Sequence, residues 1–162
     1  KRSLWTVVTL ASSSAAARPG WDVTLADLSE DALSLTRENA AALELANVTT
    51  VHSDLFSDLR GTYGGIAANL PYVPETERGT LTKEVMHDPA SALFGGPDGL
   101  DVIRRFIPEA YQRLNPGGWL VLEIGHDQAS QVAGFLEKSG FSRIEVKNDL
   151  SGIPRFPLAW RD

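Results

Sequence analysis

The chain has 162 residues, 43% of them hydrophobic and 22% charged, a balance that suits one globular domain and excludes a disordered chain. It has no cysteine, so disulfides and thiolate metal sites are excluded, and no apolar run reaches the roughly 18 residues of a membrane span. The formal net charge of −6 argues against binding nucleic acid through its phosphates, and the start lacks a secretory pattern, so we expect one cytoplasmic domain over residues 1–162.

The first predicted strand covers residues 4–10, which are rich in Trp, Thr and Val. Small residues follow at 11–17 and fit either a loop or a short helix. We assign residues 4–10 to the centre of the sheet, because a sheet without its central strand would leave a hole in the core.

A second strand over residues 23–26 ends at Asp27, and a helix capped by Ser29 then extends to about Leu45. An acid at the end of the second strand hydrogen-bonds ribose in nucleotide-binding α/β folds. Asp27 is therefore a ribose ligand or a helix-entry residue, and it can be both. At helical spacing, the residues predicted to face the sheet are Leu28, Ala32, Leu35, Asn39 and Leu43.

A third strand is predicted at residues 48–52 and is followed by Asp54, Leu55 and Phe56. Two interpretations of this turn stay open. Either Asp54 and Leu55 contact a ligand, or Asp54 is a turn residue and Leu55 belongs to the core. We assign Phe56 to the core. His52 is interpreted as a surface residue of the strand, since no second metal-binding side chain is spaced near it.

The most informative stretch is residues 66–72, Ile-Ala-Ala-Asn-Leu-Pro-Tyr. Its apolar start, bounded by two glycines at 64–65 and by Pro71, predicts a buried parallel strand that ends at Asn69. The carboxyl edge of an open α/β sheet is where ligands bind, and an asparagine there can hydrogen-bond a planar amide or amine beside the flat face of Tyr72. A turn that merely ends a strand explains the same residues.

Residues 73–99 lack clear periodicity and predict a long functional loop, of the kind that often forms a lid. A helix over 98–114 follows, with a kink expected at Pro108. Its buried face is predicted to hold Leu100, Ile103, Ile107, Tyr111 and Leu114.

The Asn-Pro-Gly-Gly sequence at 115–118 predicts a turn before a buried strand at 119–124. A helix at 128–139 comes next. The chain is then predicted to close with an antiparallel addition to the sheet, formed by two strands at 141–147 and 156–160.

Residues 69–72 resemble the Asn-Pro-Pro-Tyr signature of S-adenosylmethionine-dependent amino methyltransferases, with Leu70 in place of the first proline. The blocks ASALFGGPDGLD at 90–101 and NPGGWLVLEIG at 115–125 resemble the catalytic domain of protein-(glutamine-N5) methyltransferases that modify peptide chain release factors. The resemblance covers about residues 21–162. It implies a Rossmann-like methyltransferase fold, with a mostly parallel central sheet, an antiparallel terminal strand and helices on both faces.

The resemblance also implies a reaction, in which S-adenosylmethionine methylates the side-chain nitrogen of a glutamine in a release factor. The Asn69 side-chain carbonyl and the Leu70 backbone carbonyl would accept the two N–H bonds of that amide. Pro71 would stiffen the turn, and Tyr72 would pack on the flat amide. No metal is implied.

For the cofactor, the resemblance implies contacts from three further positions and from Asn69. Asp27 would bind the ribose, Asp54 would lie near the exocyclic amine of the adenine, and Leu55 would pack against the ring. The family's glycine-rich loop is absent, since residues 9–15 hold Thr, Ala and Ser where an acid and glycines are expected. Three explanations stay open: a foreign or out-of-frame segment, a missing stretch, or a loss of cofactor affinity.

Two other functions also fit these residues. Asn-Leu-Pro-Tyr is similar to the signature of adenine-N6 methyltransferases, which act on RNA or DNA, although the acidic charge and the downstream block argue against them. A non-catalytic, partner-binding relic of the fold would explain the degraded glycine loop. The N-terminal helical domain usual in the family is also absent, which predicts weaker binding of the release factor.

Overall fold

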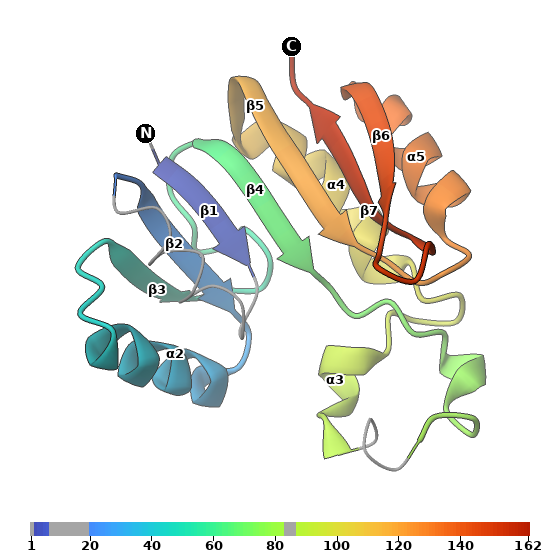
Figure 1. The fold of residues 1–162 in the computed structure, drawn as a ribbon, viewed down its shortest axis with the longest axis horizontal. Coiled ribbons are helices and arrows are strands. Elements are labelled where there is room, and N and C mark those ends of the chain that lie inside the picture. Colours follow the sequence, from blue (N-terminus) through green and yellow to red (C-terminus); the bar gives the residue numbers. More distant parts are fainter. Residues whose placement is uncertain (1, 7–19, 83–86) are drawn as a thin grey trace.

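The computed structural model describes residues 2–6, 20–82 and 87–162. In this part of the chain, a seven-stranded sheet has the order β3-β2-β1-β4-β5-β7-β6 (Figure 1). The strands are β1 (Arg2–Thr6), β2 (Asp22–Asp27), β3 (Val48–His52), β4 (Tyr63–Asn69), β5 (Leu114–Glu123), β6 (Ser142–Asn148) and β7 (Pro154–Trp160). The pairs from β3 across to β5 are parallel, whereas β7 runs antiparallel to both β5 and β6. The predicted mixed sheet is confirmed.

The order of the strands reverses between β1 and β4, which lie side by side at the centre of the sheet (Figure 1). The chain runs from β1 outward to β2 and β3, and then returns to β4 on the other side of β1. Such a switch point opens a crevice at the carboxyl ends of the strands, where α/β sheets bind ligands. Asn69 is the last residue of β4 and therefore lies at this edge.

The helices are α2 (Glu30–Ala42), α3 (Ala90–Leu93), α4 (Asp101–Arg113) and α5 (Ala129–Lys138), with a 3-10 turn η1 at Glu75–Glu77. The connection through α2 moves outward on one side of β1, and the connection through α4 moves outward on the other side. Because such crossovers are right-handed, α2 and α4 cover opposite faces of the sheet. Figure 1 shows α4 behind β5, and α5 beside β6.

Helix α2 begins as predicted but is rotated relative to the prediction. The Ser29 hydroxyl accepts a hydrogen bond from the Ala32 amide at 3.3 Å and caps the helix. The buried residues of α2 are Leu33 and Thr36, whose hydroxyl donates to the Ala32 carbonyl and so can enter the core. The predicted inward face was therefore wrong: its three leucines are more than half exposed, namely Leu28, Leu35 and Leu43.

Helix α4 closes the main core, as predicted. Leu100, Ile103, Ile107 and Leu114 are fully buried, and Phe106 adds a ring that packs on Phe56 with the ring centroids 5.0 Å apart. The assignment of Phe56 to the core is thus confirmed. The helix continues past Pro108 without an interruption.

Two strand boundaries differ from the prediction. The Gly64-Gly65 pair lies inside β4 and does not bound it. A side chain at Gly65 is excluded, because the ring of Trp119 occupies the space where its Cβ would stand. Residues 115–118 form a bulge within β5, where the register against β4 shifts, in place of a turn before it.

Other elements fall within a few residues of their predicted bounds. Strand β1 starts two residues before the predicted strand, and the rest of the predictions for residues 7–19 lie outside the described residues. The structure describes the predicted loop at 73–82 and 87–99, where η1 and α3 extend beyond the carboxyl end of β4 (Figure 1). Across the described residues, no helix is long and apolar enough to cross a membrane.

Candidate active site

Asn69 stands exposed between two buried neighbours. Ala68 and Leu70 are 3% and 6% exposed and anchor the backbone on both sides of it. Within the described ranges 2–6, 20–82 and 87–162, no hydrogen bond occupies the Asn69 side chain. The backbone is thus held by apolar packing, while the amide is left available at the switch point.

Tyr72 and Glu123 meet beside Asn69. In the register of the parallel strands, Asn69 of β4 pairs with Glu123 of β5. The Tyr72 hydroxyl donates a hydrogen bond to Glu123 Oε1 at 3.4 Å. Burial, and then the charge of Glu123, raises the pKa of the Tyr72 hydroxyl above its ordinary value. Asn69 and Tyr72 were predicted here. For Glu123, near the end of the strand predicted at 119–124, the sequence left open a position facing the site or an anchor for backbone amides, with the anchor favoured, and the structure places it against Tyr72.

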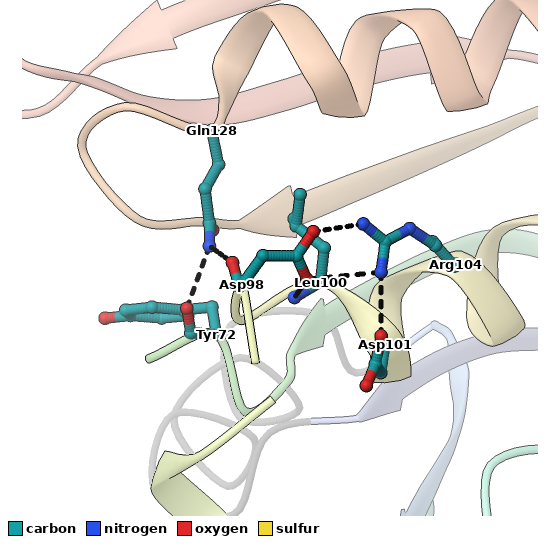
Figure 2. Close-up of polar contacts among 6 residues, drawn as sticks. All are labelled: Tyr72, Asp98, Leu100, Asp101, Arg104 and Gln128. Carbon is teal, nitrogen blue, oxygen red and sulfur yellow. Dashed lines mark hydrogen bonds and ion pairs between the residues drawn. The ribbon is translucent and has the colours of Figure 1, made fainter. Parts of the chain in front are cut away.

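Gln128, which the sequence did not single out, holds the backbone of this turn. It is 3% exposed and lies just before α5. Its Nε2 donates to the Tyr72 carbonyl at 2.9 Å and to the Asp98 carbonyl at 3.4 Å, while its Oε1 accepts from the Gly125 amide at 2.8 Å. Figure 2 shows the Gln128 side chain reaching the first two of these groups. One buried amide thus joins three loops at the carboxyl edge of the sheet.

Two glycines of the block at 90–101 let that block pack directly on the turn. A Cβ on Gly95 would collide with the Pro71 carbonyl oxygen, and a Cβ on Gly99 would collide with the Tyr72 carbonyl oxygen. Gly99 also has a φ of +75°, which disfavours other residues. The block resembling the glutamine methyltransferases is therefore the physical support of residues 69–72.

Charged side chains hold the start of α4, directly after the block that packs on the turn at 69–72. The Asp98 carboxylate pairs with Arg104 and accepts a hydrogen bond from the Leu100 amide at 3.1 Å, and Arg104 Nη1 also contacts Asp101 Oδ1 at 2.7 Å (Figure 2). The Arg104 guanidinium holds the pKa of the Asp98 carboxyl below its ordinary value. These groups are largely solvated, so they orient the loop more than they stabilise the fold.

The predicted cofactor residues lie at the ends of β2 and β3. Asp27 is the last residue of β2, and its Oδ1 accepts a hydrogen bond from the Ser29 amide at 2.7 Å, so its role in helix entry is confirmed. Leu55 is half-buried against the core and has a φ of +49°, a conformation that is uncommon for leucine.

Asp54 forms an ion pair with a residue of helix α4. Its Oδ2 lies 3.1 Å from Nη2 of Arg105 on α4, and both side chains are exposed. The structure thus brings Asn69, Tyr72 and Glu123 together and pairs Asp54 with a helix. His52 is exposed, as predicted. No cluster of three or more His, Asp or Glu side chains that could hold a metal ion occurs among the described residues.

The sequence of the chain is similar to those of known methyltransferases. The sequence model of the methyltransferase small domain family matches residues 7–99. The release factor glutamine methyltransferase of Deinococcus radiodurans is 45% identical over 146 residues, which cover 90% of this chain and 52% of the relative. Other relatives with that name are 35% to 42% identical. The chain spans about half the length of the curated relatives it matches.

Solved structures establish the fold. A methyltransferase from Pyrococcus furiosus superposes with a TM-score of 0.72 at 18% identity, over 98% of this chain and 73% of that protein. SMU.1697c from Streptococcus mutans, in complex with SAH, superposes with a TM-score of 0.65 at 16% identity, over 99% of this chain and 88% of its own. The fold is the predicted Rossmann-like methyltransferase fold. Since the family model matches more than half of its residues, the chain belongs to the methyltransferase small domain family.

Proposed function

We propose that the chain transfers a methyl group from S-adenosylmethionine to the side-chain nitrogen of a glutamine in a peptide chain release factor. The observation that carries this proposal is the exposed Asn69 amide, which stands at the switch point on a turn held by Gln128. The names of relatives at 35% to 45% identity support the substrate. Release factors act at ribosomes, so we propose the cytoplasm as the place of the reaction.

The acceptor amide sets the main chemical demand. Its nitrogen is a poor nucleophile because the lone pair is delocalised into the carbonyl. The Asn69 side-chain carbonyl and the Leu70 backbone carbonyl would accept its two N–H bonds and aim the lone pair along one direction. Leu70 suits this role, because its buried side chain fixes the carbonyl that follows. Tyr72 would pack on the amide plane.

The edge of the sheet offers groups that fit the cofactor, which supplies an electrophilic methyl group on a sulfonium. Among the described residues, the hydrogen bond to the Asp27 carboxylate comes from the Ser29 amide to Oδ1, so the second oxygen would serve ribose hydroxyls. Leu55 offers an apolar surface to the adenine, and Asp54 offers a carboxylate to its amine. Asn69 would border the methyl group. The bound SAH of the Streptococcus mutans neighbour supports a cofactor of this class.

Labelled S-adenosylmethionine, incubated with the chain and a release factor, tests the proposal directly. We expect label in the release factor, and Asn69→Ala should lower the rate at least about 100-fold without changing the fold. Asn148→Ala is a matched control, because Asn148 is also an exposed asparagine at a strand end, on β6. Turnover retained by Asn69→Ala would refute the role of Asn69.

The same experiment separates the two alternatives. The N6 amine of adenine presents the same pair of N–H bonds, so RNA and DNA are included as acceptors, and label in nucleic acid alone rejects a glutamine substrate. A calorimetric titration with S-adenosylmethionine addresses the non-catalytic relic. The absence of binding heat would reject both enzymatic functions for this chain.

A further inference from the structure

Glu123 is a carboxylate at the candidate active site that binding of the acceptor amide and of the cofactor leaves unused. It is the last residue of β5 and is half-buried, next to the fully buried Leu122 and Ile124. Paired residues on neighbouring parallel strands project to the same side of the sheet. The register of Glu123 with Asn69 therefore places the carboxylate beside the amide that would hold the acceptor.

Glu123 has no cationic partner among the residues that the structure describes. The nearby Arg155 is engaged elsewhere: its Nη1 donates to the Ile124 carbonyl at 2.9 Å, and its Nε lies 3.6 Å from Asp149 Oδ2. Among the described residues, the side chain that hydrogen-bonds Glu123 is Tyr72. A partly buried carboxylate without a cation is costly, which points to a use for its charge.

We propose that Glu123 is a further catalytic residue, whose carboxylate stabilises the positive charge that the acceptor nitrogen gains during methyl transfer. This inference rests on the proposed function. The geometry behind it is the gathering of Asn69, Glu123 and Tyr72 at the ends of two adjacent strands.

The carbon–sulfur bond breaks and leaves its electron pair on sulfur, so the sulfonium becomes a neutral thioether. The lone pair of the amide nitrogen forms the new carbon–nitrogen bond, and the nitrogen takes up the positive charge. The proton that this nitrogen then carries leaves to water. A fixed negative charge beside the nitrogen lowers the energy of this step and does little for the neutral amide before it.

A purely structural role for Glu123 is the alternative, since it could serve only to orient Tyr72. Glu123→Gln separates the two roles. Glutamine has the same size and keeps a carbonyl oxygen that can accept the Tyr72 hydroxyl, so it preserves the orientation and removes the charge. Glu123→Asp keeps the charge at a shorter reach. Glu137→Gln is the matched control, because Glu137 is exposed on α5.

The experiment measures kcat and KM for methylation of the release factor. In Glu123→Gln we expect kcat to fall about 10- to 100-fold, the effect of removing one charge near a developing charge at an intermediate dielectric constant. KM for the release factor should change less than about threefold, Glu123→Asp should regain part of kcat, and Glu137→Gln should match the parent. A Glu123→Gln variant with the parent's kcat overturns the inference.

Tyr72 reports the charge of Glu123 without any turnover. Ultraviolet titration of the phenols, with Tyr72→Phe to identify the Tyr72 signal, should show a lower pKa for Tyr72 in Glu123→Gln than in the parent. An unchanged pKa means that no carboxylate charge lies beside Tyr72, which overturns the inference. A parent chain that binds S-adenosylmethionine but labels no release factor overturns the proposed function instead, and this inference falls with it.

Discussion

The two halves of the candidate active site are built in different ways. On the acceptor side, the turn at 69–72 is fixed by a buried glutamine and by glycines that pack against its carbonyls. On the cofactor side, Asp27 and Asp54 are held by local or exposed contacts, to the Ser29 amide and to Arg105. The side proposed for the acceptor is therefore preorganised by the fold, whereas the described residues of the side proposed for the cofactor are held by solvated charges.

This difference determines what a substitution should do. A change to the buried support of the turn at 69–72, at Gln128 or at the glycines that pack on it, should cost stability and catalysis together, because the same contacts shape the turn and close the core. A change on the cofactor side should affect cofactor binding and leave unfolding almost unaltered.

Gly99→Ala should have the largest effect on stability. Its new Cβ would strike the Tyr72 carbonyl oxygen, and its backbone would keep a φ of +75°. We expect the free energy of unfolding to fall by about 3 kcal/mol, from a steric and a conformational term. Gly134→Ala on α5 is the control, because a Cβ there meets no atom within 4 Å. In a helix interior that alanine should raise stability by about 0.5–1 kcal/mol. Urea unfolding measures both, and equal effects would contradict the proposed support by Gly99.

Gln128→Ala should have the second-largest effect on stability. It leaves the Tyr72 carbonyl and the Gly125 amide without their buried partner. We expect about 2 kcal/mol of destabilisation and a loss of kcat, with less effect on the binding of S-adenosylmethionine. Gln131→Ala, at an exposed position on the same helix, should change stability by less than about 0.5 kcal/mol. A stable but catalytically unaltered Gln128→Ala would show that the turn holds its shape without this side chain.

The sequence predicted the positions at this edge that depend on local pattern. An apolar run that stops at Asn69 places that residue at a strand end, and the acid after the second strand places Asp27 in the same way. These placements are confirmed, while the chemical roles of both residues stay predictions. Local pattern suffices here because a strand end is set by the residues of that strand.

Contacts between residues far apart in the chain could not be predicted from the sequence. Gln128 meets a carbonyl 56 residues earlier, and Glu123 meets a phenol 51 residues earlier. Neither pairing leaves a periodic signal. The rotation of α2 was missed because Leu28, Leu35 and Leu43 form one stripe, whereas the buried residues Leu33 and Thr36 form another. Thr36 can be buried because its hydroxyl hydrogen-bonds within the helix. A hydrophobicity pattern cannot rank a threonine above a leucine.

Asp54→Ala tests the cofactor side. If Asp54 contacts the adenine, its loss should weaken the binding of S-adenosylmethionine about 10-fold by calorimetry, which corresponds to one hydrogen bond. The free energy of unfolding should change by less than about 1 kcal/mol, since the ion pair with Arg105 is exposed. Arg105→Ala removes the same ion pair and keeps the carboxylate, so its affinity should stay within about twofold of the parent. An equal loss in both variants would mean that the ion pair, and not a ligand contact, is the role of Asp54.

Asp98→Asn should have the smallest effect on the free energy of unfolding. Asp98 lies on the side proposed for the acceptor, at its solvated rim. Arg104 and the Leu100 amide hold the pKa of its carboxyl below the ordinary value of 3.8. A carboxyl with a lowered folded pKa adds stability that is complete above the unfolded value and is lost as the pH falls through the folded value. Asp98→Asn should therefore be slightly less stable than the parent at neutral pH, and the difference should vanish as acid is added below 3.8. Urea unfolding at several pH values measures it. A stability difference that does not depend on pH would mean that Asp98 contributes through its packing and not through its charge. The solvated rim would then be held by packing, as the buried turn at 69–72 is.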